Sequence, residues 1–153
     1  MEDHCPASIR MSKRYPSSTS AAAEQGTAAH EMREFCLKLG VQPQSCLGMF
    51  FNGYEVDQEM VDGVSIDVNY VRRLEIEYGV KPLLEKRVVM SSLGRNDVYG
   101  TGDTLFISRK KRIAHVIDFK YGRGVVEIDN NSQCQGYGVS TLDTFDLWNE
   151  VDE

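Results

Sequence analysis

The strongest constraint on the fold comes from two β-prone runs separated by four basic residues. The runs are VYGTGDTLFIS at 98–108 and IAHVIDFKY at 113–121, and RKKR stands between them at 109–112. Branched and aromatic residues bounded by a polar turn predict an antiparallel β-hairpin. A run before the hairpin, LLEKRVVMSS at 83–92, predicts a third strand. The basic tip has two open roles: protection of the sheet edge with a gain in solubility, or contact with phosphate.

Helical periodicity surrounds these strands. Apolar residues spaced three or four apart predict helices over 18–39 and 56–78, and each run is followed by a glycine that can end a helix. A loop is expected at 41–53, and a last helix is expected at 131–149. The order helix, helix, three strands, helix predicts an α/β fold in which helices cover a central sheet.

Length and charge limit the classes of protein that remain. The 153 residues fit one domain, 1–153, with 1–16 as an N-terminal cap and 141–153 as an acidic end. The net charge of −6 argues against non-specific wrapping of a polyanion, but it leaves room for a local basic groove. There is no apolar run of about 18 residues and no apolar stretch near the N-terminus, so we expect a cytoplasmic protein without a membrane span.

The four cysteines are scattered along the chain and form no CxxC pair. They are Cys5, Cys36, Cys46 and Cys134. Structural disulfides are not expected in a chain without a secretion signal. These spacings also give little support to a four-cysteine zinc site.

The end of the hairpin carries the side chains that could bind a metal ion or act in catalysis. Alternate side chains of a strand face the same way, so Asp118 and Lys120 share a face. Alone, this pair is adequately explained as an ion pair at a strand end. A tight turn at RKKR, however, brings Asp103 beside Asp118, and neighbouring carboxylates either raise a pKa or require a cation. Mg²⁺ is often held by one or two carboxylates, and Lys120 beside it could stabilise a phosphate or position water.

Two further motifs make the pattern specific. Gly26-Thr27-Ala28-Ala29-His30 lies on the first expected helix, and Gln133-Cys134-Gln135-Gly136-Tyr137 lies on the last. Together with D-x(14)-D-F-K on the hairpin, this order resembles the PD-(D/E)XK nuclease superfamily, in its RecB-type and lambda-exonuclease-like branch. The flanking Cys5-Pro6-Ala7-Ser8 and the DFKYGRG stretch resemble a phage-associated subgroup of that branch.

The resemblance implies a restriction-endonuclease-like core, with a central mixed β-sheet flanked by helices. It implies hydrolysis of DNA phosphodiester bonds with Mg²⁺ or Mn²⁺, and an exonuclease of phage DNA recombination or processing in the host cell cytoplasm. DNA is the implied partner, together with a homo-oligomer or a phage recombination protein. The implied metal ligands are the side chains of His30, Asp103 and Asp118 and the backbone carbonyl of Phe119. The implied catalytic residues are Asp103, Asp118, Lys120, Gln133 and Tyr137. The residues implied to contact DNA are Tyr121, Arg123, Gln133 and Tyr137.

Other interpretations stay open at this point. The net charge of −6 and the short segment after the last helix also fit a catalytically inactive nucleic-acid-binding or assembly module on the same fold. A small α/β domain with an incidental ion pair is a third interpretation, and it predicts that His30, Asp103 and Asp118 lie far apart. Glu85 on the first strand is a candidate for an additional acidic group near the metal. No cysteine follows Cys134, so the cysteines do not match those of the iron–sulfur relatives in this branch.

Overall fold

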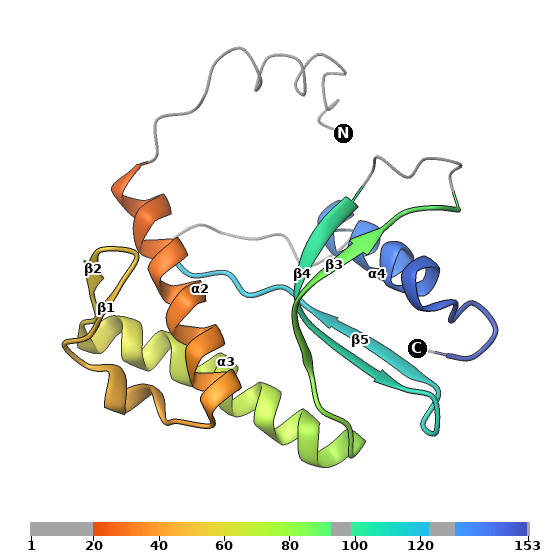
Figure 1. Cartoon of the computed structure of the whole chain (residues 1–153), viewed down its shortest axis with the longest axis horizontal. Coiled ribbons are helices and arrows are strands. Elements are labelled where there is room, and N and C mark those ends of the chain that lie inside the picture. Colours follow the sequence, from red (N-terminus) through yellow and green to blue (C-terminus); the bar gives the residue numbers. More distant parts are fainter. Residues whose placement is uncertain (1–19, 93–98, 123–130, 153) are drawn as a thin grey trace, which may run out of the picture.

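The fold combines a three-stranded antiparallel sheet with a pair of long helices that lie beside it. The computed structural model describes residues 20–92, 99–122 and 131–152. The strands β3 (Leu83–Val89), β4 (Tyr99–Ser108) and β5 (Ile113–Ile117) follow one another across the sheet in this order (Figure 1). The expected N-terminal cap at 1–16 lies outside the described residues.

The β4–β5 hairpin confirms the strand pair that was predicted around the basic turn. Its register places Thr104 opposite Ile117 and Ser108 opposite Ile113. The strand β5 nevertheless ends at Ile117, although the apolar run predicted a strand to residue 121. The reason is that the Phe119 N–H donates its hydrogen bond to the Asp103 side chain, with 2.7 Å between the nitrogen and Oδ2, instead of to a backbone carbonyl of β4. Residues 118–122 therefore leave the sheet and run towards the helices (Figure 1).

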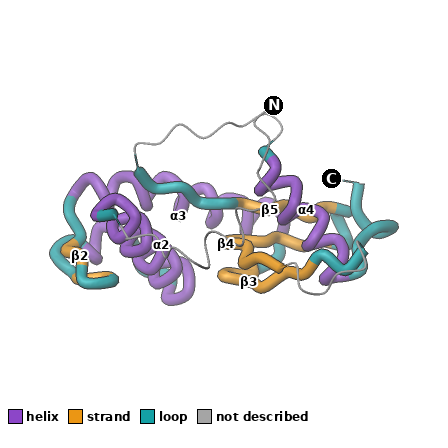
Figure 2. The backbone as a smooth tube through the Cα atoms, turned by 90° about the horizontal axis from the view of Figure 1, so that it is seen from above, coloured by secondary structure: helices purple, strands orange, loops and turns teal. Residues whose placement is uncertain are grey.

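Two long helices pack against each other beside the sheet. The helix α2 (Ala21–Leu39) begins where the Ser20 side chain accepts the Ala23 N–H, and α3 (Gln58–Tyr78) begins where Asp57 accepts the Met60 N–H. A glycine with a left-handed backbone follows each helix, as the sequence predicted. Figure 2 shows α2 and α3 gathered at one end of the molecule, with the sheet and α4 at the other.

The connection between these helices is more ordered than the loop that the sequence predicted. It contains the 3-10 helix η1 (Pro43–Cys46) and the short antiparallel pair β1 (Phe50–Phe51) and β2 (Tyr54–Glu55). Three glycine or asparagine residues there have positive φ angles, at Gly48, Asn52 and Gly53, and such tight turns carry no periodic signal.

The last helix, α4 (Ser132–Phe145), lies against β3 and β5. It is shorter than the predicted 131–149 because Asp146 adopts a left-handed backbone and the Leu147 N–H turns back to the Leu142 carbonyl. This turn buries the Leu147 side chain completely.

The class of fold is confirmed as a mixture of helices and antiparallel strands, but the described residues do not form the expected mixed sheet. Both pairings of the three-stranded sheet are antiparallel among the described residues, because β3, β4 and β5 simply follow one another in the chain. The apolar core lies mainly between α2 and α3, where Phe119 joins it from the segment after β5. In the part of the chain that the structure describes, no helix combines the length and the apolar character needed to cross a membrane.

Candidate metal centre

Three potential metal ligands from three different elements converge beside the sheet. They are His30 on α2, Glu85 on β3 and Asp103 on β4, and their ligand atoms all lie within 4.8 Å of one another. The His30 Nδ1 atom is 3.8 Å from the Asp103 Oδ2 atom. His30 and Asp103 were both predicted as ligands, and they lie close together, which the third interpretation did not expect. Their role as metal ligands stays a prediction.

Glu85 joins this group through an irregularity of β3. Its neighbours pair with β4 in register, Leu84 with Thr104 and Lys86 with Gly102, so Glu85 lies across from Asp103. Glu85 itself has a φ of 47°, in the left-handed region that residues other than glycine seldom adopt. Strained residues of this kind are concentrated at functional sites.

Asp103 is the most enclosed member of the group, with 8% of its surface exposed. Burial raises the pKa of Asp103 above its usual value; the Phe119 N–H and His30 act to lower the pKa, and the nearby Asp118 carboxylate raises it further. The pKa of Glu85 is raised as well, by partial desolvation of its carboxyl group and by the charge of Asp103, although much of the Glu85 surface is exposed. The protein by itself therefore disfavours the ionised carboxylates, which is the condition that a bound cation relieves.

This donor set fits the ions that the sequence suggested. Carboxylate oxygens are the ligands that Mg²⁺ and Mn²⁺ prefer, and an imidazole nitrogen can complete such a site. The His30 ring packs edge-on against Phe119, with 5.1 Å between the ring centroids, and this contact restricts the orientation of the imidazole.

Asp118 and Lys120 lie next to this group and form an ion pair. The Lys120 Nζ atom is 2.8 Å from the Asp118 Oδ2 atom. Asp118 is close enough to affect the pKa of Asp103. It does not belong to the group of three residues whose ligand atoms lie within 4.8 Å of one another. Burial acts to lower the pKa of Lys120, yet the hydrogen bond and charge of Asp118, supported by Asp103, outweigh burial and raise the pKa overall.

The two motif residues of α4 are close to the Asp118 carboxylate. The Gln133 Nε2 atom is 3.4 Å from both the Asp118 Oδ1 atom and the Tyr137 hydroxyl. The ring of Tyr137 lies so close to β4 that a Cβ atom at Gly100 would be 2.5 Å from it. The structure thus brings Gln133 and Tyr137 together with Asp118, while their contact with DNA stays a prediction.

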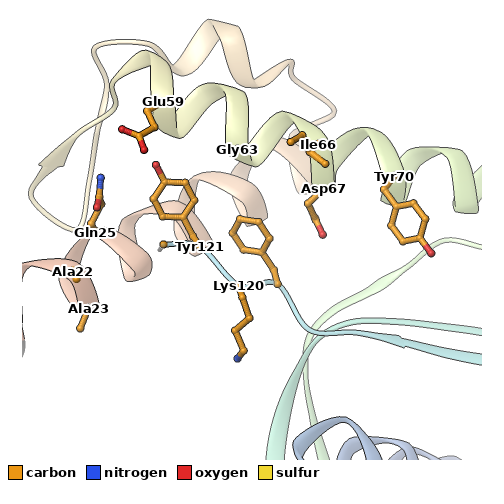
Figure 3. Close-up of a pocket in the computed structure, with 12 residues that line it drawn as sticks. Ala22, Ala23, Gln25, Glu59, Gly63, Ile66, Asp67, Tyr70, Lys120 and Tyr121 are labelled. Atoms are coloured by element: carbon orange, nitrogen blue, oxygen red, sulfur yellow. The ribbon is translucent and has the colours of Figure 1, made fainter. Parts of the chain in front are cut away.

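The residues around Lys120 form the floor of a groove of about 980 Å³ between the first turns of α2 and one face of α3. Figure 3 shows the ring of Tyr121 pointing towards α3, whereas Lys120 points to the opposite side. Phe119 belongs to the core, and its proposed role as a metal ligand through its carbonyl stays a prediction. Tyr121 is half-buried in this groove, and Arg123 lies outside the described residues.

Fold and site together define a mixed α/β protein with a histidine–carboxylate group able to hold a divalent cation. The chain belongs to the family described as "Protein of unknown function (DUF2800)", whose model matches residues 3–153. No solved structure matches the chain.

One buried polar residue of this region was not predicted. Arg33 lies three residues after His30 on α2 and has only 1% of its surface exposed. The available signal was an arginine at a helical position shared with Ala29, Met32 and Cys36, where an apolar side chain is otherwise expected.

Proposed function

We propose that the protein is a divalent-metal-dependent nuclease that hydrolyses phosphodiester bonds in DNA on a restriction-endonuclease-like core. The observation that carries the proposal is the convergence of His30, Glu85 and Asp103 from three elements within 4.8 Å. The lysine of the D-x-K motif stands on the segment that bonds Asp103, which supports the resemblance noted from the sequence. The proposal includes an exonuclease role in phage DNA processing.

Each residue has a defined role in this proposal. His30, Glu85 and Asp103 hold the ion, and the carbonyl of Phe119 and the carboxylate of Asp118 are the additional ligands that the resemblance implies. Mg²⁺ or Mn²⁺ in this position supplies Lewis-acid polarisation of a phosphoryl oxygen and a lowered pKa of water.

Lys120 acts in this proposal as a cation and not as a base. Its raised pKa keeps the ammonium group protonated at neutral pH, so Lys120 can donate hydrogen bonds and stabilise the negative charge that develops on the phosphate. Asp118 orients Lys120, and Gln133 in turn lies within reach of Asp118. We assign Tyr121, Arg123, Gln133 and Tyr137 to contacts with DNA.

The experiment is hydrolysis of linear single- and double-stranded DNA by the purified chain with Mg²⁺, Mn²⁺ or EDTA. We expect cleavage with a metal ion and none with EDTA. The variants Asp103→Asn and Lys120→Ala should lose about 100-fold or more in rate, since each removes an interaction used in the transition state. Lys81→Ala is the matched control, because it removes an exposed lysine that is not among the residues assigned to the site.

Two outcomes would count against this function. A folded wild-type chain that neither binds Mn²⁺ in calorimetry nor cleaves DNA is not a metal-dependent nuclease. Binding of DNA without hydrolysis, under either metal, would instead support the inactive binding module.

A further inference from the structure

Arg33 is a charged side chain enclosed in the interior between α2, α3 and β4. It lies in the middle of α2, and only 1% of its surface is exposed. A guanidinium group cannot lose its proton in a protein, so its charge must be balanced by partners in place. These partners show what the residue holds together.

The guanidinium group joins α2 to two other elements. Its Nε atom is 2.5 Å from the Asp67 Oδ2 atom on α3, and its Nη2 atom donates to the Thr104 Oγ1 atom on β4, also at 2.5 Å. Thr104 directly follows Asp103 along β4. Arg33 therefore ties the helix that carries one proposed ligand to the strand that carries another.

Arg33 also holds the segment that carries the D-x-K motif. Its guanidinium carbon is 5.4 Å from the centroid of the Phe119 ring, and His30 packs on the same ring edge-on. The backbone N–H of Phe119 donates to Asp103. Phe119 is thus held by α2 through its side chain and by Asp103 through its backbone.

We propose that Arg33 is a positioning residue of the metal centre: it fixes His30 and the Phe119 backbone relative to Asp103 by bonding α3 and β4 at once. This inference rests on the proposed metal-dependent function, but its geometric part concerns the metal-free protein as well. A planar fork of donors makes both bonds with directional geometry, and the single ammonium of lysine does not.

A second arginine in the same helix pair provides a matched control. Arg72 on α3 donates from Nη2 to the carbonyl oxygens of Cys36, at 3.2 Å, and Val41, at 2.7 Å. It also joins α3 to α2 and the following loop, but none of these hydrogen bonds involves His30, Asp103 or Phe119. Loss of stability alone should therefore affect both arginine variants, whereas loss of positioning should affect only Arg33.

The test compares Arg33→Lys and Arg72→Lys with two readouts. The first is Mn²⁺ affinity by calorimetry, which we expect to fall about 10- to 100-fold for Arg33→Lys and to stay within twofold of the wild type for Arg72→Lys. The second is the NOE between the His30 and Phe119 rings in the metal-free protein, which we expect to weaken strongly only in Arg33→Lys. Thr104→Val removes the bond to β4 alone and should shift both readouts in the same direction, so it replaces Arg33→Lys if that variant does not fold.

The proposal is overturned if the Arg33 variant, or Thr104→Val in its place, keeps the wild-type NOE and the wild-type Mn²⁺ affinity. It is also overturned if Arg72→Lys loses as much affinity and as much NOE intensity. Failure of the proposed function looks different, because the wild-type chain then binds no Mn²⁺ while the NOE comparison still decides the positioning role.

Discussion

A glycine in the middle of α3 allows the ring of Tyr121 to approach the helix. A Cβ atom built at Gly63 would lie 2.9 Å from the Tyr121 Cε2 atom and 3.4 Å from Cδ2. Gly138 in the middle of α4 is equally half-buried, but no neighbouring atom lies within 4 Å of its Cβ position. These two glycines therefore separate the effect of helix propensity from the effect of crowding.

We predict opposite results for Gly63→Ala and Gly138→Ala. Alanine in a helix interior is favoured over glycine by about 0.8–1.0 kcal/mol, and Gly138→Ala should gain this amount. Gly63→Ala gains the same term but loses about 1–3 kcal/mol to overpacking against the ring, so it should be destabilised by about 0–2 kcal/mol overall. For a chain of this size, 1 kcal/mol corresponds to a shift in Tm of about 2–4 °C.

Urea and thermal unfolding measure both free energies, and a double-mutant cycle identifies the cause. In a Tyr121→Ala background the crowding is absent, so Gly63→Ala should there become stabilising by about the same amount as Gly138→Ala. The reasoning is refuted if Gly63→Ala stabilises the chain as much as Gly138→Ala with Tyr121 in place, or if removal of the ring leaves its effect unchanged.

Two further predictions follow from the pKa values of buried groups. Because the pKa of Asp103 is raised in the folded state, the metal-free protein loses stability as pH rises from the usual pKa of this carboxyl group through the raised one. The raised pKa of Glu85 adds a loss of the same sign, so Asp103→Asn should reduce the loss without abolishing it. Urea unfolding of the wild type and the variant at several pH values measures the difference, and equal pH profiles would contradict the prediction. Burial, together with the hydrogen bond and charge of Cys46, raises the pKa of Cys36 to about 12. Iodoacetamide at pH 8 should therefore modify the exposed Cys134 and leave Cys36 and Cys46 unmodified until urea unfolds the chain, as peptide mass spectrometry can measure. Rapid labelling of either buried thiol in the native protein would contradict this prediction.

Local patterns predicted the elements that depend on nearby residues. The glycines that end α2 and α3 and the basic turn between β4 and β5 are all short-range signals. The hairpin register followed from the turn, and it brought Asp103 near Asp118 as expected.

Features that depend on long-range packing were harder to predict from the sequence. Glu85 approaches Asp103 because of a left-handed residue within β3, and no sequence pattern marks a glutamate for that conformation. Arg33 interrupts the apolar face of α2, and only the positions of Asp67 and Thr104 explain why it is buried there. The end of β5 could not be predicted, because the side chain of Asp103 replaces a backbone acceptor only in the folded sheet.

The hydrogen bond from the Phe119 N–H to Asp103 links the stability of the fold to the geometry of the site. Along residues 118–121, Phe119 and Tyr121 pack against the core between the helices. Lys120 points away from α3 (Figure 3) and forms an ion pair with Asp118. A carboxylate that only bound a cation could be removed with little effect on the backbone, but Asp103 also accepts the N–H at the point where this segment leaves β4. Asparagine retains an acceptor for that N–H and alanine does not, so Asp103→Asn is the variant that separates loss of charge from loss of this backbone contact.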